Sequence, residues 1–155
     1  MTAHSFDLKT LVLAKHAQHV VVIHFPIALF LSGVALDCAA QWTKKSALSV
    51  AAYINLLLAA IATVPAVATG LIAWQWALEG QRIKGVLLLH LLFGLTSTIL
   101  IWVVWSIHFM SRRKTGSLGL QAATLPAYRI FLEVVAVSMV ALTGHLGGFL
   151  SGVNG

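Results

Sequence analysis

Residues 85–110, GVLLLHLLFGLTSTILIWVVWSIHFM, contain no aspartate, glutamate, lysine or arginine. A run of about 20 apolar residues is long enough to cross the hydrocarbon core of a bilayer as a helix. An open strand would leave backbone groups without partners in lipid, so the stretch predicts a transmembrane helix. Three more apolar runs have charged residues at their ends: 18–41, 49–76 and 127–150.

The sequence therefore predicts an all-α integral membrane protein, an up-down bundle of four transmembrane helices formed by residues 18–155. The composition agrees, because 59% of the 155 residues are hydrophobic and 9% are charged, against about a quarter charged in soluble domains. Short connections at 42–48 and 77–84 make each pair of runs an antiparallel hairpin. Residues 1–17 mix apolar and polar side chains and form an N-terminal interfacial segment, either a surface helix or a docking element.

The basic residues report orientation rather than nucleic-acid binding, because the net charge of +6 comes from short connections. One side of the membrane carries six basic residues and the other carries four: Lys44, Lys45, Arg112, Arg113, Lys114 and Arg129, against Lys9, Lys15, Arg82 and Lys84. The positive-inside rule places the first group in the cytoplasm. We expect a multi-pass protein of the bacterial inner membrane with both termini in the periplasm.

Several histidines lie at the predicted periplasmic side of the four spans. His16, His19 and His24 open the first span, His90 lies one turn into the third, and His145 lies about one turn before the end of the fourth. Because ionisable groups are costly in hydrocarbon, imidazoles from three helices at one depth predict a bound cofactor. Helix bundles commonly build such sites from facing side chains.

Haem b held by two histidines is the first candidate, and it would be noncovalent because no Cys-x-x-Cys-His motif is present. The expected axial ligands are His19, His24, His90 and His145. Small residues lie at helical spacing beside the last three of them, namely Ala28, Gly94, Ala141 and Gly148. His19 and His24 differ by about 140° around a helix, so either Pro26 distorts the helix or two haems bind. A copper or other transition-metal ion on the same imidazoles is an alternative.

His108 lies about 27 Å from His90 along the same helix, and no other span has a histidine at that depth. We therefore interpret His108 as an interfacial residue beside Arg112. Two acids lie inside spans. Glu133 is one turn from Arg129 and is expected to pair with it, and Asp37 is expected to meet Arg129 or to extend towards Lys44.

Several motifs together resemble one known family. They are His19-Val-Val-Val-Ile-His24-Phe-Pro-Ile-Ala-Leu29, Thr69-Gly-Leu71, His90-Leu-Leu92 and Thr143-Gly-His-Leu-Gly-Gly148. This pattern over residues 19–153 resembles DUF2231, a family of small bacterial four-helix membrane proteins. The resemblance implies haem binding and respiratory electron transfer, with His19, His24, His90 and His145 at its recurring polar positions. The chain departs from the pattern at Ile72-Ala73-Trp74, where the family often has an acid, and after Gly148, where it often has a tyrosine.

The expected function is that of a haem b electron-transfer subunit of a respiratory or other redox complex, carrying one or two haems and not itself an enzyme. Its expected partners are the lipid bilayer, other subunits of that complex, and a quinone or a periplasmic cytochrome. The alternative is a cofactor-free structural subunit that anchors a larger membrane complex. Small residues fit that alternative too, because they let helices pack closely without a cofactor.

Overall fold

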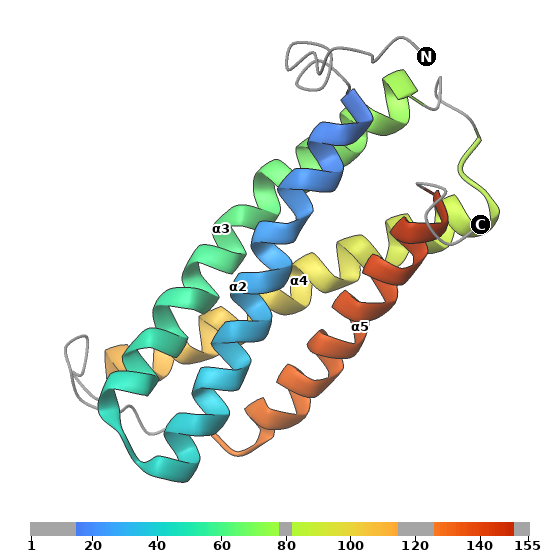
Figure 1. Ribbon diagram of the computed structural model, residues 1–155. Helices are drawn as coiled ribbons and strands as arrows, with labels where there is room; N and C mark the ends of the chain where they lie inside the picture. The colour runs from blue at the N-terminus through green and yellow to red at the C-terminus, as the bar shows by residue number, and fades with distance from the viewer. Residues whose placement is uncertain (1–14, 78–81, 115–125, 151–155) are drawn as a thin grey trace, which may run out of the picture.

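The computed structural model describes residues 15–77, 82–114 and 126–150 (Figure 1). These residues form four long helices and no strand, which confirms the all-α membrane fold. The helices are α2 (Lys15–Thr43), α3 (Ser46–Ala77), α4 (Gly85–Lys114) and α5 (Tyr128–Leu150). Each contains a segment long and apolar enough to cross a membrane: Gln18–Thr43, Ser46–Gln75, Gly85–Lys114 and Tyr128–Leu150.

The helices end where the predicted apolar runs end, to within a few residues. α2 stops at a tight turn in which Lys44 has a positive φ of 57° and its N–H donates to the carbonyl oxygen of Ala40 at 2.8 Å. A residue in this left-handed conformation is a common way to end a helix. Residues 1–14 lie outside the described part, so the predicted interfacial segment stays a prediction.

The bundle is built from two hairpins. α2 packs along α3, α4 packs along α5, and the contact between α2 and α5 is slight. Figure 1 shows the two hairpins side by side. Their shared core is small and drawn from all four helices: Phe30, Leu56, Ala59, Ala60, Ile101, Val104, Ala136 and Val140.

Glycine and alanine allow the first hairpin to pack closely. A Cβ added to Gly33 would lie 2.9 Å from Cδ2 of Leu56 and 3.3 Å from its backbone nitrogen. Small residues at helix interfaces permit such close approach in membranes, where packing rather than water exclusion drives association. α2 and α3 therefore form a tight unit.

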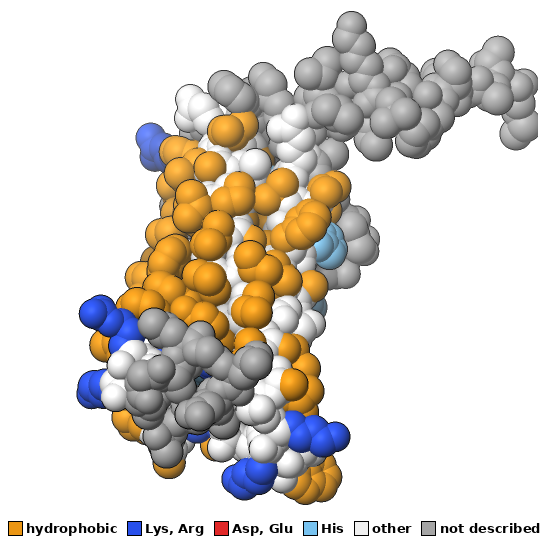
Figure 2. Space-filling model, turned by 90° about the vertical axis from the view of Figure 1, so that its left-hand side faces the viewer, with side chains coloured by type: hydrophobic (Ala, Val, Ile, Leu, Met, Phe, Trp, Pro, Cys, Tyr) orange, Lys and Arg blue, Asp and Glu red, His pale blue; other side chains and the backbone are white. Residues whose placement is uncertain are grey.

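Large apolar side chains cover the outside of the bundle. Val64 is 61% exposed and Phe131 is 70% exposed. Figure 2 shows a face that is hydrophobic over most of its length, with most of its Lys and Arg side chains towards the lower end. This surface suits lipid, because acyl chains are as apolar as the side chains that meet them.

The two ends of the bundle differ in chemistry. At one end α2 and α4 begin and α3 and α5 end, and a cavity opens between the hairpins there; we call this the pocket end. At the opposite end α2 and α4 end and α3 and α5 begin, and charged side chains are buried there; we call this the ion-pair end.

Candidate functional site: an apolar pocket with two oriented histidines

A cavity of about 450 Å³ lies at the pocket end, lined by residues of all four helices. This volume is within the range of small-molecule sites, which are mostly apolar with a few polar groups. Its lining is of this kind. The polar side chains are His19, His24, Thr63, His90, Ser97, Thr98 and Thr143, and glycines 70, 94, 144, 147 and 148 supply bare backbone.

His19 of α2 and His90 of α4 meet at this cavity. Their ring centroids are 6.4 Å apart and their planes are nearly perpendicular, at 84°. Both side chains are half-buried. The structure thus brings together one histidine from each hairpin.

The hydrogen bonds of His90 define its tautomer. Its Nδ1 lies 3.1 Å from the backbone carbonyl oxygen of Thr143, on α5. A carbonyl can only accept, so Nδ1–H is the donor. In the neutral ring Nε2 then carries the lone pair, which is the form of imidazole that binds a metal.

The same reasoning applies to His19 through Thr69 on α3. The Thr69 hydroxyl donates its proton to backbone carbonyls of its own helix, at 2.8 Å to Pro65 and 3.0 Å to Ala66. Its oxygen therefore accepts from Nδ1–H of His19, at 3.2 Å. A hydroxyl has one proton and two lone pairs, so this arrangement satisfies it. This arrangement favours the tautomer of His19 that carries its proton on Nδ1.

Glycines leave room for both rings. A Cβ on Gly70 would lie 3.0 Å from Cε1 of His19, and a Cβ on Gly147 would lie 3.2 Å from Cε1 of His90. Either substitution would press on a ring. The glycine that follows Thr69 and the one near Thr143 thus help to set the position of the histidine that each threonine binds.

The other two predicted ligands lie differently. His24 lines the pocket but is exposed, and its Nδ1 donates to the carbonyl of Val20 on its own helix at 2.6 Å. His145 is exposed and packs its ring on Phe149 at 5.0 Å; it is not among the residues that line the pocket.

The rotation of α5 explains the position of His145. Gly144 and Gly147 line the pocket, and each residue advances about 100° around a helix. His145 therefore points away from both hairpins' shared cavity. Of the small residues expected beside a porphyrin, Gly94 and Gly148 line the pocket, whereas Ala28 and Ala141 are exposed. Residue spacing predicts how deep these residues lie along α5, but it does not predict which side of α5 faces the pocket.

Thr69 and Thr143 are site residues for which the sequence predicted no role. The signal was present, because both begin Thr-Gly motifs that carry the family resemblance. Nothing in the chain alone relates Thr69 to His19, fifty residues earlier.

The ion-pair end corrects the interpretation of His108. It was expected at the interface beside Arg112, but its side chain is 1% exposed and its Nε2 lies 3.1 Å from Oε1 of Glu133. Arg112 instead donates to the backbone oxygen and hydroxyl of Ser49 at 2.8 and 3.0 Å. His108 is buried because its partner lies on α5, and residue spacing along α4 could not predict that contact.

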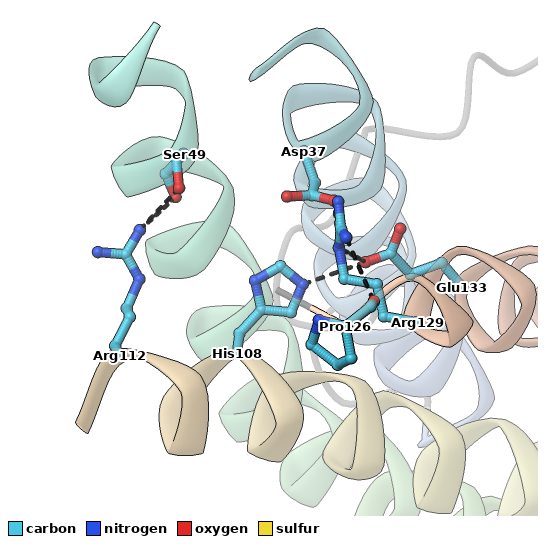
Figure 3. A network of polar contacts seen from close by, with 7 residues as sticks. All are labelled: Asp37, Ser49, His108, Arg112, Pro126, Arg129 and Glu133. Atoms are coloured by element: carbon cyan, nitrogen blue, oxygen red, sulfur yellow. Dashed lines mark hydrogen bonds and ion pairs between the residues drawn. The ribbon is translucent and has the colours of Figure 1, made fainter. Parts of the chain in front are cut away.

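The expected ion pairs of Arg129 are confirmed. Its Nε and Nη2 donate to Oδ2 of Asp37 at 2.9 and 2.7 Å (Figure 3), and Nε lies 3.9 Å from Oε1 of Glu133. Of the two partners considered for Asp37, the structure selects Arg129. The network joins α2, α4 and α5 at the end opposite the pocket.

A family model described as a predicted membrane protein, DUF2231, matches residues 15–155. The chain belongs to the DUF2231 family. The match extends over all four helices and includes the pocket and the ion-pair network, and it confirms the resemblance drawn from the histidine and Thr-Gly motifs. No curated protein matches the chain, and no solved structure does.

Proposed function

We propose that this DUF2231 protein is a haem b-binding membrane subunit that transfers electrons, with His19 and His90 as the axial ligands. The observation that carries the proposal is the placing of the two imidazoles at the pocket. The Nδ1 of each ring lies within hydrogen-bond distance of an oxygen on the neighbouring helix, and histidines that bind a metal through Nε2 commonly make such an outer hydrogen bond.

The spacing of the rings supports bis-imidazole ligation. A metal–imidazole bond is about 2.0 Å long, and the ring centre lies about 1.1 Å behind the nitrogen, so two rings on one metal have centroids about 6 Å apart. The observed separation is 6.4 Å. The separation of the ring centroids is therefore close to that of two imidazoles on one iron.

The pocket also has the surroundings that a porphyrin needs. Its wall is mainly apolar, and glycines on α3, α4 and α5 leave flat surface beside the rings. Ile83 lines the cavity, and Arg82 and Lys84 beside it in the chain are exposed, so positive charge at this end of the bundle would favour the propionates.

Bound haem would supply one-electron redox chemistry, and the chain would control it. Thr69 and Thr143 orient the axial imidazoles, and hydrogen bonds of this kind raise ligand basicity. The apolar wall limits water and thereby influences the potential. One pair of histidines is assembled among the described residues, which favours one haem over two.

The wider setting belongs to the same proposal. The protein would lie in the bacterial inner membrane with its pocket end towards the periplasm. It would pass electrons between a quinone or membrane cytochrome and a partner at the outer face, as a subunit rather than as an enzyme.

Optical spectra test the proposal. Protein purified in detergent from haem-replete cells should show a low-spin b-type spectrum, with haem extracted by acidic acetone. His19→Ala and His90→Ala should each abolish the low-spin form, whereas the exposed His145→Ala, at the same end, should keep it.

Two results would contradict the haem assignment. A colourless protein that holds stoichiometric copper would replace haem with a metal ion on the same imidazoles. A colourless protein without metal would support the cofactor-free structural subunit.

A further inference from the structure

The ion-pair end contains two buried carboxylate oxygens that lack hydrogen-bond partners among the described residues. They are Oδ1 of Asp37 and Oε2 of Glu133, and both side chains are 1% exposed. A buried polar atom without a partner is costly, and the cost is higher for a charged group. Such oxygens indicate a ligand that would satisfy them.

We propose that Asp37, His108 and Glu133 form a binding site for a divalent transition-metal ion, separate from the pocket. One ligand comes from each of α2, α4 and α5, and one donor atom of each residue lies within 4.8 Å of the other two. The site lies about 27 Å along α4 from His90, so it is independent of the proposed haem.

The spacing of the donors is close to that of a coordination sphere. With bonds of about 2.1 Å and angles between octahedral and tetrahedral, adjacent ligand atoms lie about 3.0–3.4 Å apart. Nε2 of His108 and Oε1 of Glu133 are 3.1 Å apart as hydrogen-bond partners. A metal would replace the proton between them, and their distance already has the length of one edge of the sphere. A donor atom of Asp37 lies within 4.8 Å of one on each of the other two residues, so a movement of its side chain would complete the set.

Arg129 orients the third ligand. Its two hydrogen bonds to Asp37 both go to Oδ2, so Oδ1 remains for the metal. Ligating carboxylates commonly have such an outer hydrogen-bonding partner. Figure 3 shows the guanidinium between the two carboxylates. The two carboxylates outnumber the guanidinium that pairs with them, so Asp37, Glu133 and Arg129 together carry a charge of −1.

The donor set selects the class of metal. One imidazole with two carboxylates suits Mn²⁺, Fe²⁺, Co²⁺ or Zn²⁺, whereas Ca²⁺ and Mg²⁺ prefer oxygen ligands alone. Asp37 is six residues from the end of α2 and His108 is six from the end of α4. A rise of about 1.5 Å per residue places both ligands about 9 Å from the helix ends, so the site lies nearer to one membrane surface than to the middle of the bundle.

Cobalt titration in detergent tests the site, using protein purified with a tag free of histidine. The background carries His19→Gln and His90→Gln, so that the pocket histidines do not bind the probe. This protein should bind one Co²⁺ per chain, measured by dialysis and elemental analysis, with visible d–d bands. Adding His108→Gln, Glu133→Gln or Asp37→Asn should lower the affinity more than tenfold.

The control adds His145→Gln to the same background, because it removes an exposed histidine at the other end and should leave Co²⁺ binding unchanged. A folded background protein, judged by gel filtration and circular dichroism, that binds no Co²⁺, Mn²⁺ or Zn²⁺ would overturn the proposal and leave the network as ion pairs only. Binding that survives all three ligand substitutions would also overturn it.

Should the ligand variants fail to fold, the unsubstituted network still provides a test. In the background protein labelled with ¹⁵N-histidine, Co²⁺ should shift or broaden the imidazole resonance of His108. An unchanged His108 resonance at saturating Co²⁺ would reject the site.

Discussion

Single side chains at the pocket are positioned in pairs that cross between helices. His19 takes its orientation from Thr69, and His90 takes its orientation from the backbone of Thr143. Each partner contributes an acceptor oxygen, which favours the tautomer with the ring proton on Nδ1. The orientation of both imidazoles therefore depends on two residues outside the predicted ligand set.

Thr69→Val tests this dependence, because valine keeps the shape of threonine and removes the oxygen. We expect haem affinity to fall about 10- to 100-fold, as for other outer hydrogen-bonding partners of metal ligands. The measurement is haem titration followed by the absorption spectrum, and Thr69→Ser should restore binding.

Thr98→Val is the matched control for this change. Thr98 also lines the pocket, but its hydroxyl donates to the carbonyl of Gly94 on its own helix at 2.9 Å. Equal loss of affinity in the two valine variants would show that the hydroxyl of Thr69 does not orient His19.

Arg129→Met tests the ion-pair end. Arg129 is 3% exposed and Asp37 is 1% exposed, so the substitution leaves an uncompensated buried carboxylate. Breaking a buried pair in this way costs about 3–5 kcal/mol. Unfolding in detergent should show this loss, and the added change Asp37→Asn should recover part of it.

Arg113→Met serves as the comparison, because Arg113 is an exposed arginine on the last turn of α4. It should change the free energy of unfolding by less than about 0.5 kcal/mol. If Arg129→Met were as stable as Arg113→Met, the Asp37–Arg129 pair would contribute nothing.

At the level of helices, each hairpin carries one oriented histidine. Thr69 and His19 lie on α3 and α2, and Thr143 and His90 lie on α5 and α4. A metal bound between the two rings would consequently link α2 of one hairpin to α4 of the other. Packing within each hairpin positions its own histidine.

Gly33→Ala tests the close packing of the first hairpin. The added Cβ would meet Cγ of Leu56 at 3.0 Å and its backbone nitrogen at 3.3 Å, and a backbone atom in a helix cannot move aside. Overpacking of this kind costs about 1–3 kcal/mol, which thermal unfolding in detergent should detect.

The matched substitution is Gly144→Ala on α5, where nothing lies within 4 Å of the added Cβ. It should be neutral or stabilising, because alanine favours helix over glycine by about 1 kcal/mol. A Gly33→Ala protein as stable as the Gly144→Ala protein would show that α2 and α3 are not so close.

For the whole bundle, burial changes which basic residues are exposed at each end, and the exposed ones bear on the orientation in the membrane. Arg112 and Arg129 are buried, so the exposed basic residues of the ion-pair end are Lys44, Lys45, Arg113 and Lys114. At the pocket end the exposed ones among the described residues are Arg82 and Lys84. The ion-pair end keeps the excess and is expected in the cytoplasm.

Reporter fusions test this orientation. Alkaline phosphatase fused at the C-terminus should be active, because it would lie in the periplasm, and a fusion after Lys114 should be inactive. The opposite pattern would place the pocket at the cytoplasmic face and require partners there.

The four helices and their depths follow from the sequence by itself. Apolar runs such as 85–110 have one stable form in lipid, because only a helix satisfies its own backbone there. Depth then follows from the rise per residue, which is why His19, His24, His90 and His145 were all placed at one end. The pairing of Arg129 with Glu133 was equally visible, because it is local to one helix.

Only the tertiary structure decided which side chains face one another. A membrane helix that is apolar on all sides has no apolar stripe that would indicate its buried side. The sequence therefore could not predict that His145 faces away from the pocket while Gly144 and Gly147 line it. The same holds for His108, which Glu133 on another helix draws into the core. Depth is a property of one helix, whereas facing depends on the packing of several.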